Sequence, residues 1–328
     1  DFDLRSRSSI GTVHYGLGLV GALAAMLEAD EQLVVYAPPD IAALLPLHDR
    51  LRIEELPRSV GVKGRMLTEQ VESVRRARRD RLSVLHLLKG MVPVAPAEGT
   101  AYVVTVHDDI PLQYLRGRFS SRRPLANNAY VSSQILWALW RADAVLTISE
   151  ASAEALAVYC RRRPVSVGEG LTVPETPSVR LAEREPRVLV FASALPHKQT
   201  AELLAALDRS AVVAEAGWRI AVVGPTRPGG TGHLDLDDLG TPTSDELHRL
   251  VRYSRLVAFH STYEGLGLPP LEAWALGTPA LRPGLPSLDA ALEGVPGRVA
   301  GLEGPRPDRA LAGLRDLDER QVSHWRAG

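Results

Sequence analysis

The stretch HSTYEGLGLPPLEAWALGTPAL (260–281) follows an apolar segment typical of a buried strand and leads into an apolar helix. Gly265 and Gly267 let the backbone approach a ligand closely. Pro269 or Pro270 suits the first helical position. A helix N-terminus preceded by glycines is a ready anion site, because its free N–H groups point at the ligand. The stretch therefore predicts a strand, a phosphate-binding loop and a helix.

Two carboxylates, Glu264 and Glu272, lie around this loop. A phosphate would repel both of them unless they face another part of the ligand. Carboxylates are strong acceptors for hydroxyl donors, so the pair suits a molecule with hydroxyls on both sides of a diphosphate, such as a nucleotide sugar. From the spacing alone, a helix N-terminus that favours Glu272 and a solvated loop that holds Glu264 explain the pair about equally well.

Short apolar strands alternate with helical segments along the whole chain. We expect strands at 32–37, 82–88, 101–106 and 143–148, and, after a break, at 187–193, 218–224, 255–260 and 278–284. Two βαβ sets predict an α/β fold with two doubly wound parallel sheets. The glycine, proline and charge of 168–186 are typical of a hinge, so we place the domains at 1–172 and 173–328. Ligands bind beyond the carboxyl ends of such strands, and residues that follow strands are therefore the candidates.

Composition narrows the class of protein. The chain has 328 residues, of which 45% are hydrophobic and 23% charged, enough for two domains with sizeable cores. A net charge of −1 argues against bulk nucleic-acid binding. A single cysteine excludes an internal disulfide and a cysteine-based zinc cluster. No apolar run approaches the roughly 20 residues that span a bilayer, so we expect a cytoplasmic protein.

A basic stretch, RRARRDR (75–81), stands out against this nearly neutral background. A solvated helix face explains most such runs. The sharper interpretation is a peripheral contact with anionic lipid headgroups on the cytoplasmic face of a membrane, or with a phosphorylated acceptor. The arginines concerned are Arg75, Arg76, Arg78, Arg79 and Arg81.

The residues at 260–281 closely resemble the signature of the GT-B glycosyltransferases of family 4, a Glu, seven residues and a second Glu. Four further segments are similar to that family in order and spacing, and they resemble its bacterial mannosyltransferase-like members: VVTVHDDIPLQY, ADAVLTISEASAEAL, VLVFASALPHKQTAELLAAL and IAVVGP. The resemblance covers residues 1–290. It implies the GT-B fold, in which two Rossmann-like domains face each other across a cleft, and a retaining glycosyltransferase that needs no bound metal.

The resemblance also implies roles for particular residues. Glu264 would hold the hydroxyls of the donor sugar, and Glu272 the ribose of the nucleotide. Lys198 would neutralise the charge that builds on the leaving diphosphate, which is the largest electrostatic need of the transfer. His107 matches a histidine that the family places near the reacting sugar. The alternatives are an ordinary surface lysine and a histidine whose hydrogen bonds are satisfied at a strand end.

The remaining candidates complete a donor side and an acceptor side. The second domain would bind the nucleotide sugar, with backbone amides meeting the diphosphate, and the first domain would bind a glycan, lipid-linked or small-molecule acceptor. The donor-binding candidates are Ser193, His197, Gly224, Gly265, Leu266, Gly267 and Leu268. The candidates on the acceptor side are Gly11, His14, Gly16 and Asp108, although a glycine-rich turn that only reverses the chain explains the first three nearly as well.

This chain departs from the family pattern in two loops. Ala192 or Ser193 occupies the place of a loop arginine that many relatives have, and His197 replaces another common arginine. Val13 falls where a second glycine is usual. These changes keep open a second hypothesis, a catalytically weak or silent GT-B-like subunit that binds a nucleotide or a partner.

The ends of the chain also differ from the pattern. Relatives begin with a full apolar strand and finish with a helix that crosses back to the first domain, whereas this sequence opens at Asp1 and closes on DERQVSHWRAG. We expect either an incomplete chain or a trimmed fold.

Nothing in the sequence has metal-ligand spacing, so we predict no metal and no cofactor apart from the nucleotide sugar as co-substrate.

Overall fold

The structure is a computed structural model that describes residues 10–56, 64, 67–119, 125–171, 173–174, 179–224, 235–293 and 308–316. The chain divides into two compact units, Asp1–Thr172 and Val173–Gly328, and this division coincides with the boundary placed from the sequence. Part of the predicted hinge, at 172 and 175–178, lies outside the described residues. The roles assigned to the two domains stay predictions.

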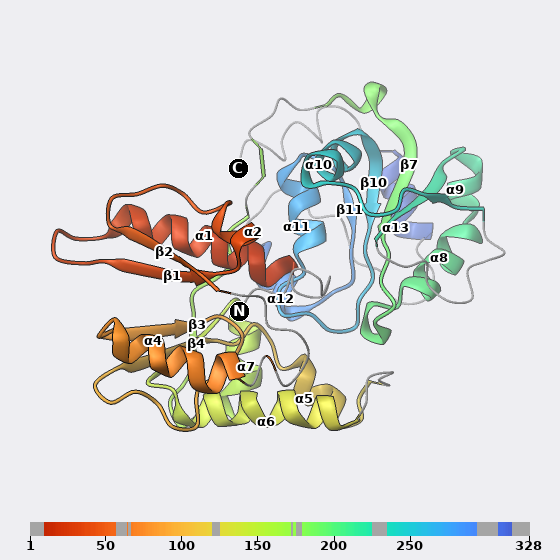
Figure 1. The fold of residues 1–328 in the computed structure, drawn as a ribbon. Helices are drawn as coiled ribbons and strands as arrows, with labels where there is room; N and C mark the ends of the chain where they lie inside the picture. The colour runs from red at the N-terminus through yellow and green to blue at the C-terminus, as the bar shows by residue number, and fades with distance from the viewer. Residues whose placement is uncertain are drawn as a thin grey trace. The chain divides into compact units, whose positions relative to one another are not determined.

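Five parallel strands form the sheet of the second unit, in the order β11-β10-β7-β8-β9 (Figure 1). The chain builds β7, β8 and β9 toward one edge and then returns to build β10 and β11 on the other side of β7. The strand order therefore reverses between β7 and β10. The strands are β7 (Glu185–Phe191), β8 (Arg219–Val223), β9 (Asp237–Asp238), β10 (Ser254–Ala258) and β11 (Ala280–Leu281).

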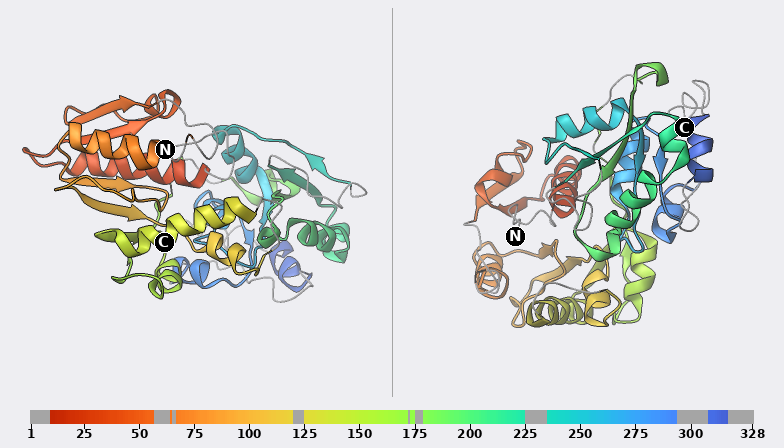
Figure 2. Two further views of the ribbon diagram at one scale, coloured as in Figure 1. Left: turned by 60° about the horizontal axis from the view of Figure 1, so that its bottom comes forward. Right: turned by 90° about the vertical axis from the view of Figure 1, so that its right-hand side faces the viewer.

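Helices cover both faces of this sheet, which makes it a doubly wound layer (Figure 1, Figure 2). Val188 and Val190 pack into one core with α8, α9 and α13, whereas Leu189 packs into the other with α10 and α11, as the alternation of a strand requires. The helices are α8 (Thr200–Asp208), α9 (Ala211–Glu215), α10 (Ser244–Tyr253), α11 (Leu268–Ala275), α12 (Pro286–Ala291) and α13 (Asp308–Arg315), with short 3₁₀ turns at Leu181–Glu183 and Pro196–Lys198.

The first unit contains two parallel sheets rather than the single sheet expected. One pairs β1 with β2, and the other has the order β3-β4-β5-β6. Side chains join them instead of a hydrogen-bonded ladder: the Tyr15 hydroxyl on α1 lies 3.2 Å from Thr105 Oγ1 on β4. The strands are β1 (Leu33–Ala37), β2 (Leu51–Glu55), β3 (Val84–Leu87), β4 (Ala101–Thr105), β5 (Ala144–Thr147) and β6 (Val165–Ser166).

Helices of the first unit pack on both sheets. The helix α1 packs on β1 and β2, while α4, α5, α6 and α7 share a core with β3, β4 and β5. None of the helices in the described ranges is long and apolar enough to cross a membrane. The helices are α1 (Ile10–Met26), α2 (Pro39–Ala42), α4 (Ser73–Arg79, preceded by a π-helical turn at Thr68–Glu72), α5 (Ile110–Leu115), α6 (Leu125–Arg141) and α7 (Glu150–Ala157).

Local signals in the sequence fixed several element boundaries. Thr243 and Glu246 form the expected capping box at the start of α10. The predicted strand at 278–284 shortens to two residues, because Pro283 has no N–H for a ladder and ends the pairing. Three observed strands, β2, β6 and β9, were not predicted, because β6 and β9 have two residues each and β2 mixes charged with apolar residues.

Candidate functional site

The reversal of strand order between β7 and β10 locates the candidate site. In an open parallel sheet, the loops that leave two neighbouring strands in opposite directions open a crevice at the carboxyl ends. The loop after β7 contains Lys198, and the loop after β10 contains Glu264. These residues are 66 positions apart in the sequence, yet β7 and β10 are paired along their length.

Lys198 and Glu264 form an ion pair beyond the carboxyl ends of these two strands. Lys198 Nζ donates to both carboxylate oxygens of Glu264, at 2.6 Å to Oε1 and 2.8 Å to Oε2. The exposed fraction is 24% for the lysine side chain and 8% for the glutamate. The pair therefore places a partly exposed cation beside a nearly buried acceptor, an arrangement that suits a charged ligand with hydroxyl groups.

The backbone before Lys198 is tied to the same loop. The carbonyl oxygen of His197 accepts from Thr262 N at 2.8 Å and from Ser261 Oγ at 2.9 Å, and Ser261 is buried. Gln199 has a φ of 40°, in the left-handed region that a residue with a side chain rarely adopts. Strained backbone of this kind persists only where its surroundings fix it, and it is common at functional sites.

The aromatic ring of Phe259 is a member of the site that the sequence analysis did not identify. Phe259 follows β10 directly and is 5% exposed. Lys198 Nζ lies over its ring, 5.5 Å from the centroid. No sequence signal marked this residue, because an apolar side chain at the end of a buried strand is ordinary core.

The helix α11 begins where the glycine loop ends. Gly267 caps it with a φ of 92°, and a Cβ at this position would lie 3.0 Å from the Leu288 side chain on α12, so glycine is needed here. The first helical residue is Leu268, which puts Pro269 in the second position rather than the first. Gly265, Leu266 and Gly267 are buried, so this turn packs closely against the sheet.

Glu272 lies one turn inside α11. Burial raises the pKa of its carboxyl group above the usual value, because the charged form loses solvation there. Within the described part of the chain, no side-chain hydrogen bond to Glu272 is present. A partly buried carboxylate without a protein donor suits a hydroxyl donated by a ligand.

Gly224 and Ser193 shape the neighbouring edge of the sheet, after β8 and β7. Gly224 has a φ of 143°, and a Cβ there would lie 2.4 Å from the carbonyl oxygen of Ala192. Ser193 N donates to Thr200 Oγ1 at 3.2 Å, and Ser193 Oγ accepts from Leu195 N at 3.2 Å. These contacts fold the loop that presents Lys198 tightly onto the end of the sheet.

In the first unit, His107 and Asp108 follow β4 as expected. His107 Nε2 donates to the carbonyl oxygen of Leu88 at 3.2 Å, and its ring meets the Tyr15 ring edge-on with centroids 5.1 Å apart. Burial lowers the pKa of His107 to about 4, so its imidazole is neutral at pH 7. Asp108 Oδ1 accepts from Ile110 N and so supports the start of α5.

The segment with Gly11, His14 and Gly16 is helical, so the alternative of a glycine-rich turn that only reverses the chain was wrong, while the place of these residues on the acceptor side stays a prediction. All three lie on α1, with His14 exposed and Gly16 buried. The helix forms because apolar residues recur at helical spacing and pack against β1 and β2, which outweighs the low helix propensity of glycine. The residues of α1 in this core are Val13, Leu17 and Val20, of which Leu17 is only partly buried.

The basic stretch on α4 is largely occupied by acidic partners. Arg79 Nη2 lies 2.7 Å from carboxylate oxygens of both Glu54 and Asp80. Arg76 lies 3.6 Å from Glu54, and Arg75 lies 3.8 Å from Glu72. Arg78 and Arg81 are exposed. Because three of the five arginines pair with carboxylates, the structure does not support a free cationic surface for a membrane.

Three histidines, of which His197 is buried and the other two are partly buried, predict a loss of stability in mild acid. Burial lowers the pKa of His86, His107 and His197 to about 4 each, helped at His197 by the charge of Lys198. In the unfolded chain they titrate near 6.5, so the unfolded state gains protons first as the pH falls. The contribution of these neutral histidines to the free energy of unfolding is therefore fully present above pH 6.5 and is lost as the pH falls from 6.5 to 4. At pH 5 the loss is up to about 2 kcal/mol per histidine.

Urea unfolding at pH 7.5 and pH 5 measures this loss. His197→Gln should reduce the difference between the two free energies of unfolding, whereas His48→Gln, at an exposed histidine, is the matched control. Equal free energies at the two pH values would contradict the prediction.

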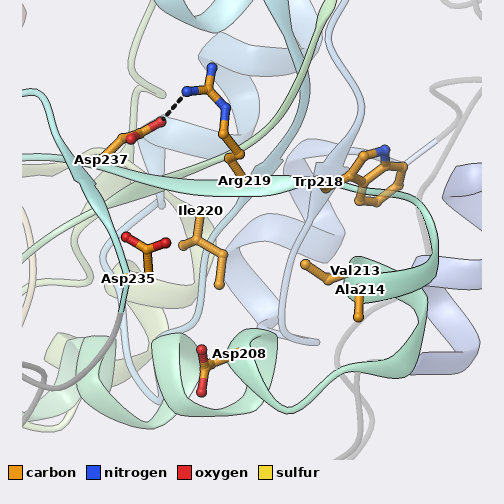
Figure 3. Close-up of a pocket in the computed structure, with 8 residues that line it drawn as sticks. All are labelled: Asp208, Val213, Ala214, Trp218, Arg219, Ile220, Asp235 and Asp237. Carbon is orange, nitrogen blue, oxygen red and sulfur yellow. Dashed lines mark ion pairs between the residues drawn. The ribbon is translucent and has the colours of Figure 1, made fainter.

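A separate cavity of about 230 Å³ lies at the other end of β8 (Figure 3). Arg219 pairs with Asp237 at its rim, 3.1 Å apart, and the other charged lining groups are acidic. Acidic walls repel phosphate, so the cavity does not suit a nucleotide. Its lining residues are Asp208, Val213, Ala214, Trp218, Arg219, Ile220, Asp235 and Asp237.

Comparison with known proteins bears on the fold. No protein-family model and no curated protein matches the chain. Among solved structures, WaaG, a glycosyltransferase involved in lipopolysaccharide biosynthesis, superposes with a TM-score of 0.65 at 13% identity, over 97% of this chain and 91% of that one. HepE from Anabaena, solved with UDP and glucose, gives a TM-score of 0.63 at 16% identity over the same shares. The chain has the GT-B fold.

TarM from S. aureus also shares the GT-B fold, with a TM-score of 0.54 at 12% identity over 71% of this chain. The present chain spans about half of TarM, since the match covers 47% of that protein. All of these identities are low. The likeness therefore establishes the arrangement of strands and helices in a GT-B protein, and the chemistry has to be argued from the residues of this chain.

Proposed function

We propose that the chain is a retaining, metal-independent glycosyltransferase that moves a sugar from a nucleoside diphosphate to a hydroxyl of a glycan, lipid-linked or small-molecule acceptor. The observation that carries the proposal is the Lys198–Glu264 pair at the strand-order reversal of a GT-B sheet. A cation and a hydroxyl acceptor side by side match the junction between a diphosphate and a sugar.

When the donor binds, its contacts with Lys198 and Glu264 would replace the ion pair between these two side chains. Its diphosphate takes the ammonium of Lys198 and the amides of the α11 N-terminus, where the helix dipole favours an anion. Its sugar hydroxyls donate to Glu264, and its ribose hydroxyls donate to Glu272. The surroundings of Glu272 fit this arrangement, because no side-chain donor bonds its carboxylate within the described residues.

In the transfer, the bond between the anomeric carbon and the diphosphate oxygen breaks as the acceptor oxygen bonds to that carbon on the same face. The leaving phosphate oxygen takes the acceptor's hydroxyl proton, which balances the charges. Lys198 stabilises the negative charge that grows on the leaving group. The assignment of His107 to the reacting sugar rests on the family resemblance.

Metal independence is part of the proposal. Among the residues that the structure describes, no group of three or more His, Cys, Asp or Glu side chains is placed to hold a metal ion. In this proposal, the charge on the diphosphate is met by Lys198 and by backbone amides instead of a metal ion.

Thermal stability in the presence of UDP, GDP, ADP or CMP, each with EDTA, tests the proposal. HepE and TarM were solved with UDP, which makes UDP the first to try. A nucleotide at 100 times its Kd stabilises the fold by about 2.7 kcal/mol, which is a clear rise in Tm. We expect one nucleotide to stabilise the wild type and to lose most of this effect in Glu272→Gln.

The outcomes separate the two candidate functions. Stabilisation by one nucleotide in EDTA, followed by turnover of its sugar conjugate, supports the transferase. Stabilisation without turnover of any sugar conjugate favours the silent binding subunit, which the absence of the usual loop arginine keeps in view. If no nucleotide shifts the Tm, the transferase and the nucleotide-binding subunit both fail, and the subunit that binds a partner is the hypothesis left to test.

A further inference from the structure

Phe259 is a second neighbour of the Lys198 ammonium, besides the carboxylate of Glu264. The ring centroid is 5.5 Å from Nζ, within the range of a cation–π interaction. Phe259 is 5% exposed, so its surroundings confine the side chain, and its backbone N–H donates to the carbonyl oxygen of Leu281 at 2.8 Å, which anchors the backbone. The lysine therefore lies beside a buried aromatic face as well as a carboxylate.

The two partners of Lys198 differ in what happens when an anion arrives. Glu264 neutralises the ammonium, and an incoming phosphate must displace it or share the cation. An aromatic face attracts the cation through its quadrupole and leaves the net positive charge in place. Of these two partners, the ring is the one that can hold Lys198 both before and after the carboxylate changes partner.

We infer that Phe259 is a positioning residue that keeps the Lys198 ammonium in place for an anionic ligand while Glu264 is released to accept hydroxyls. For the diphosphate of a nucleotide sugar, this inference rests on the proposed function. The contact between Phe259 and Lys198 is a property of the free protein. The contact and its effect on ligand binding can therefore be tested separately.

The first test is a double-mutant cycle on the free, full-length protein. Phe259→Leu removes the aromatic face, Lys198→Met removes the charge, and the double variant removes both. If the ring holds the cation, the double variant melts about 2 °C higher than the sum of the two single losses predicts. The same cycle with Phe191→Leu, a phenylalanine that ends β7, should be additive.

Two further variants guard against a packing effect. Phe259→Tyr retains the aromatic face and should retain the coupling to Lys198, whereas Phe259→Met fills the space without a ring and should lose it. Additive Tm changes in the Phe259→Leu and Lys198→Met cycle would overturn the inference. Equal coupling with tyrosine and methionine would overturn it as well.

The second test measures ligand binding with UDP as the probe. Phe259→Leu should weaken UDP binding about fivefold, and Phe259→Tyr should restore it. Unchanged binding in Phe259→Leu would show that the ring does not position Lys198 for phosphate. If wild type binds no nucleotide, the proposed function fails, and the cycle on the free protein still decides whether Phe259 holds Lys198.

Discussion

Lys198→Met is expected to lower the rate of sugar transfer about 10²- to 10³-fold, because removal of one group that stabilises transition-state charge has an effect of this size. Lys198 is the cation that the structure places at the strand-order reversal, next to the carboxylate that would hold the donor sugar. The quantity to measure is kcat. The donor in this assay is the nucleotide sugar whose nucleoside diphosphate stabilises the protein. Methionine preserves the volume of the methylene stem, so the change is mainly one of charge.

Loss of rate must be separated from loss of stability in this variant. Glu264 is 8% exposed, and in Lys198→Met its carboxylate loses its counter-ion. The Tm should therefore fall. Adding Glu264→Gln removes the uncompensated charge and should restore most of the Tm, while the rate stays low. Turnover that persists unchanged in a folded Lys198→Met protein would refute the role assigned to this residue.

Gly224→Ala is expected to destabilise the second unit by about 4 kcal/mol, since positive-φ strain and a steric overlap act together. The φ of 143° is nearly exclusive to glycine, and the new Cβ would lie 2.4 Å from the carbonyl oxygen of Ala192. That oxygen belongs to backbone just beyond β7, which cannot move without disturbing the sheet and the loop that carries Lys198. Urea unfolding of the full-length chain measures the loss.

Gly217→Ala is the matched control for this change. Gly217 also has a positive φ, 63°, but a Cβ there would meet no atom within 4 Å. Its substitution should cost only the backbone strain, about 1 kcal/mol. If Gly224→Ala and Gly217→Ala destabilise equally, the predicted collision with Ala192 does not occur.

Much of the fold could be predicted because its signals are local. The eight expected strands each overlap an observed strand, and the capping box of α10 formed as predicted. The segment that failed, residues 10–26, contains glycines that favour a turn locally. Its helix is stabilised by packing on β1 and β2, a tertiary effect that no local signal reveals.

The candidate site divides in the same way. Glu264 and Lys198 lie in loops that follow predicted strands, and the resemblance to the family signature gave both residues and Glu272 their expected roles. Phe259 escaped notice because its role depends on the ammonium that lies over its ring. An apolar residue acquires such a role only through a neighbour distant in sequence.

The sequence by itself determined the α/β alternation, the boundary near residue 172, and the glycine loop between two carboxylates. Only the tertiary structure decided that β7 and β10 are neighbours, and hence that Lys198 meets Glu264 across 66 residues. The physical reason is that strand elements are specified by local pattern, whereas their order in a sheet follows from how helices pack on both faces. Site geometry depends on that order.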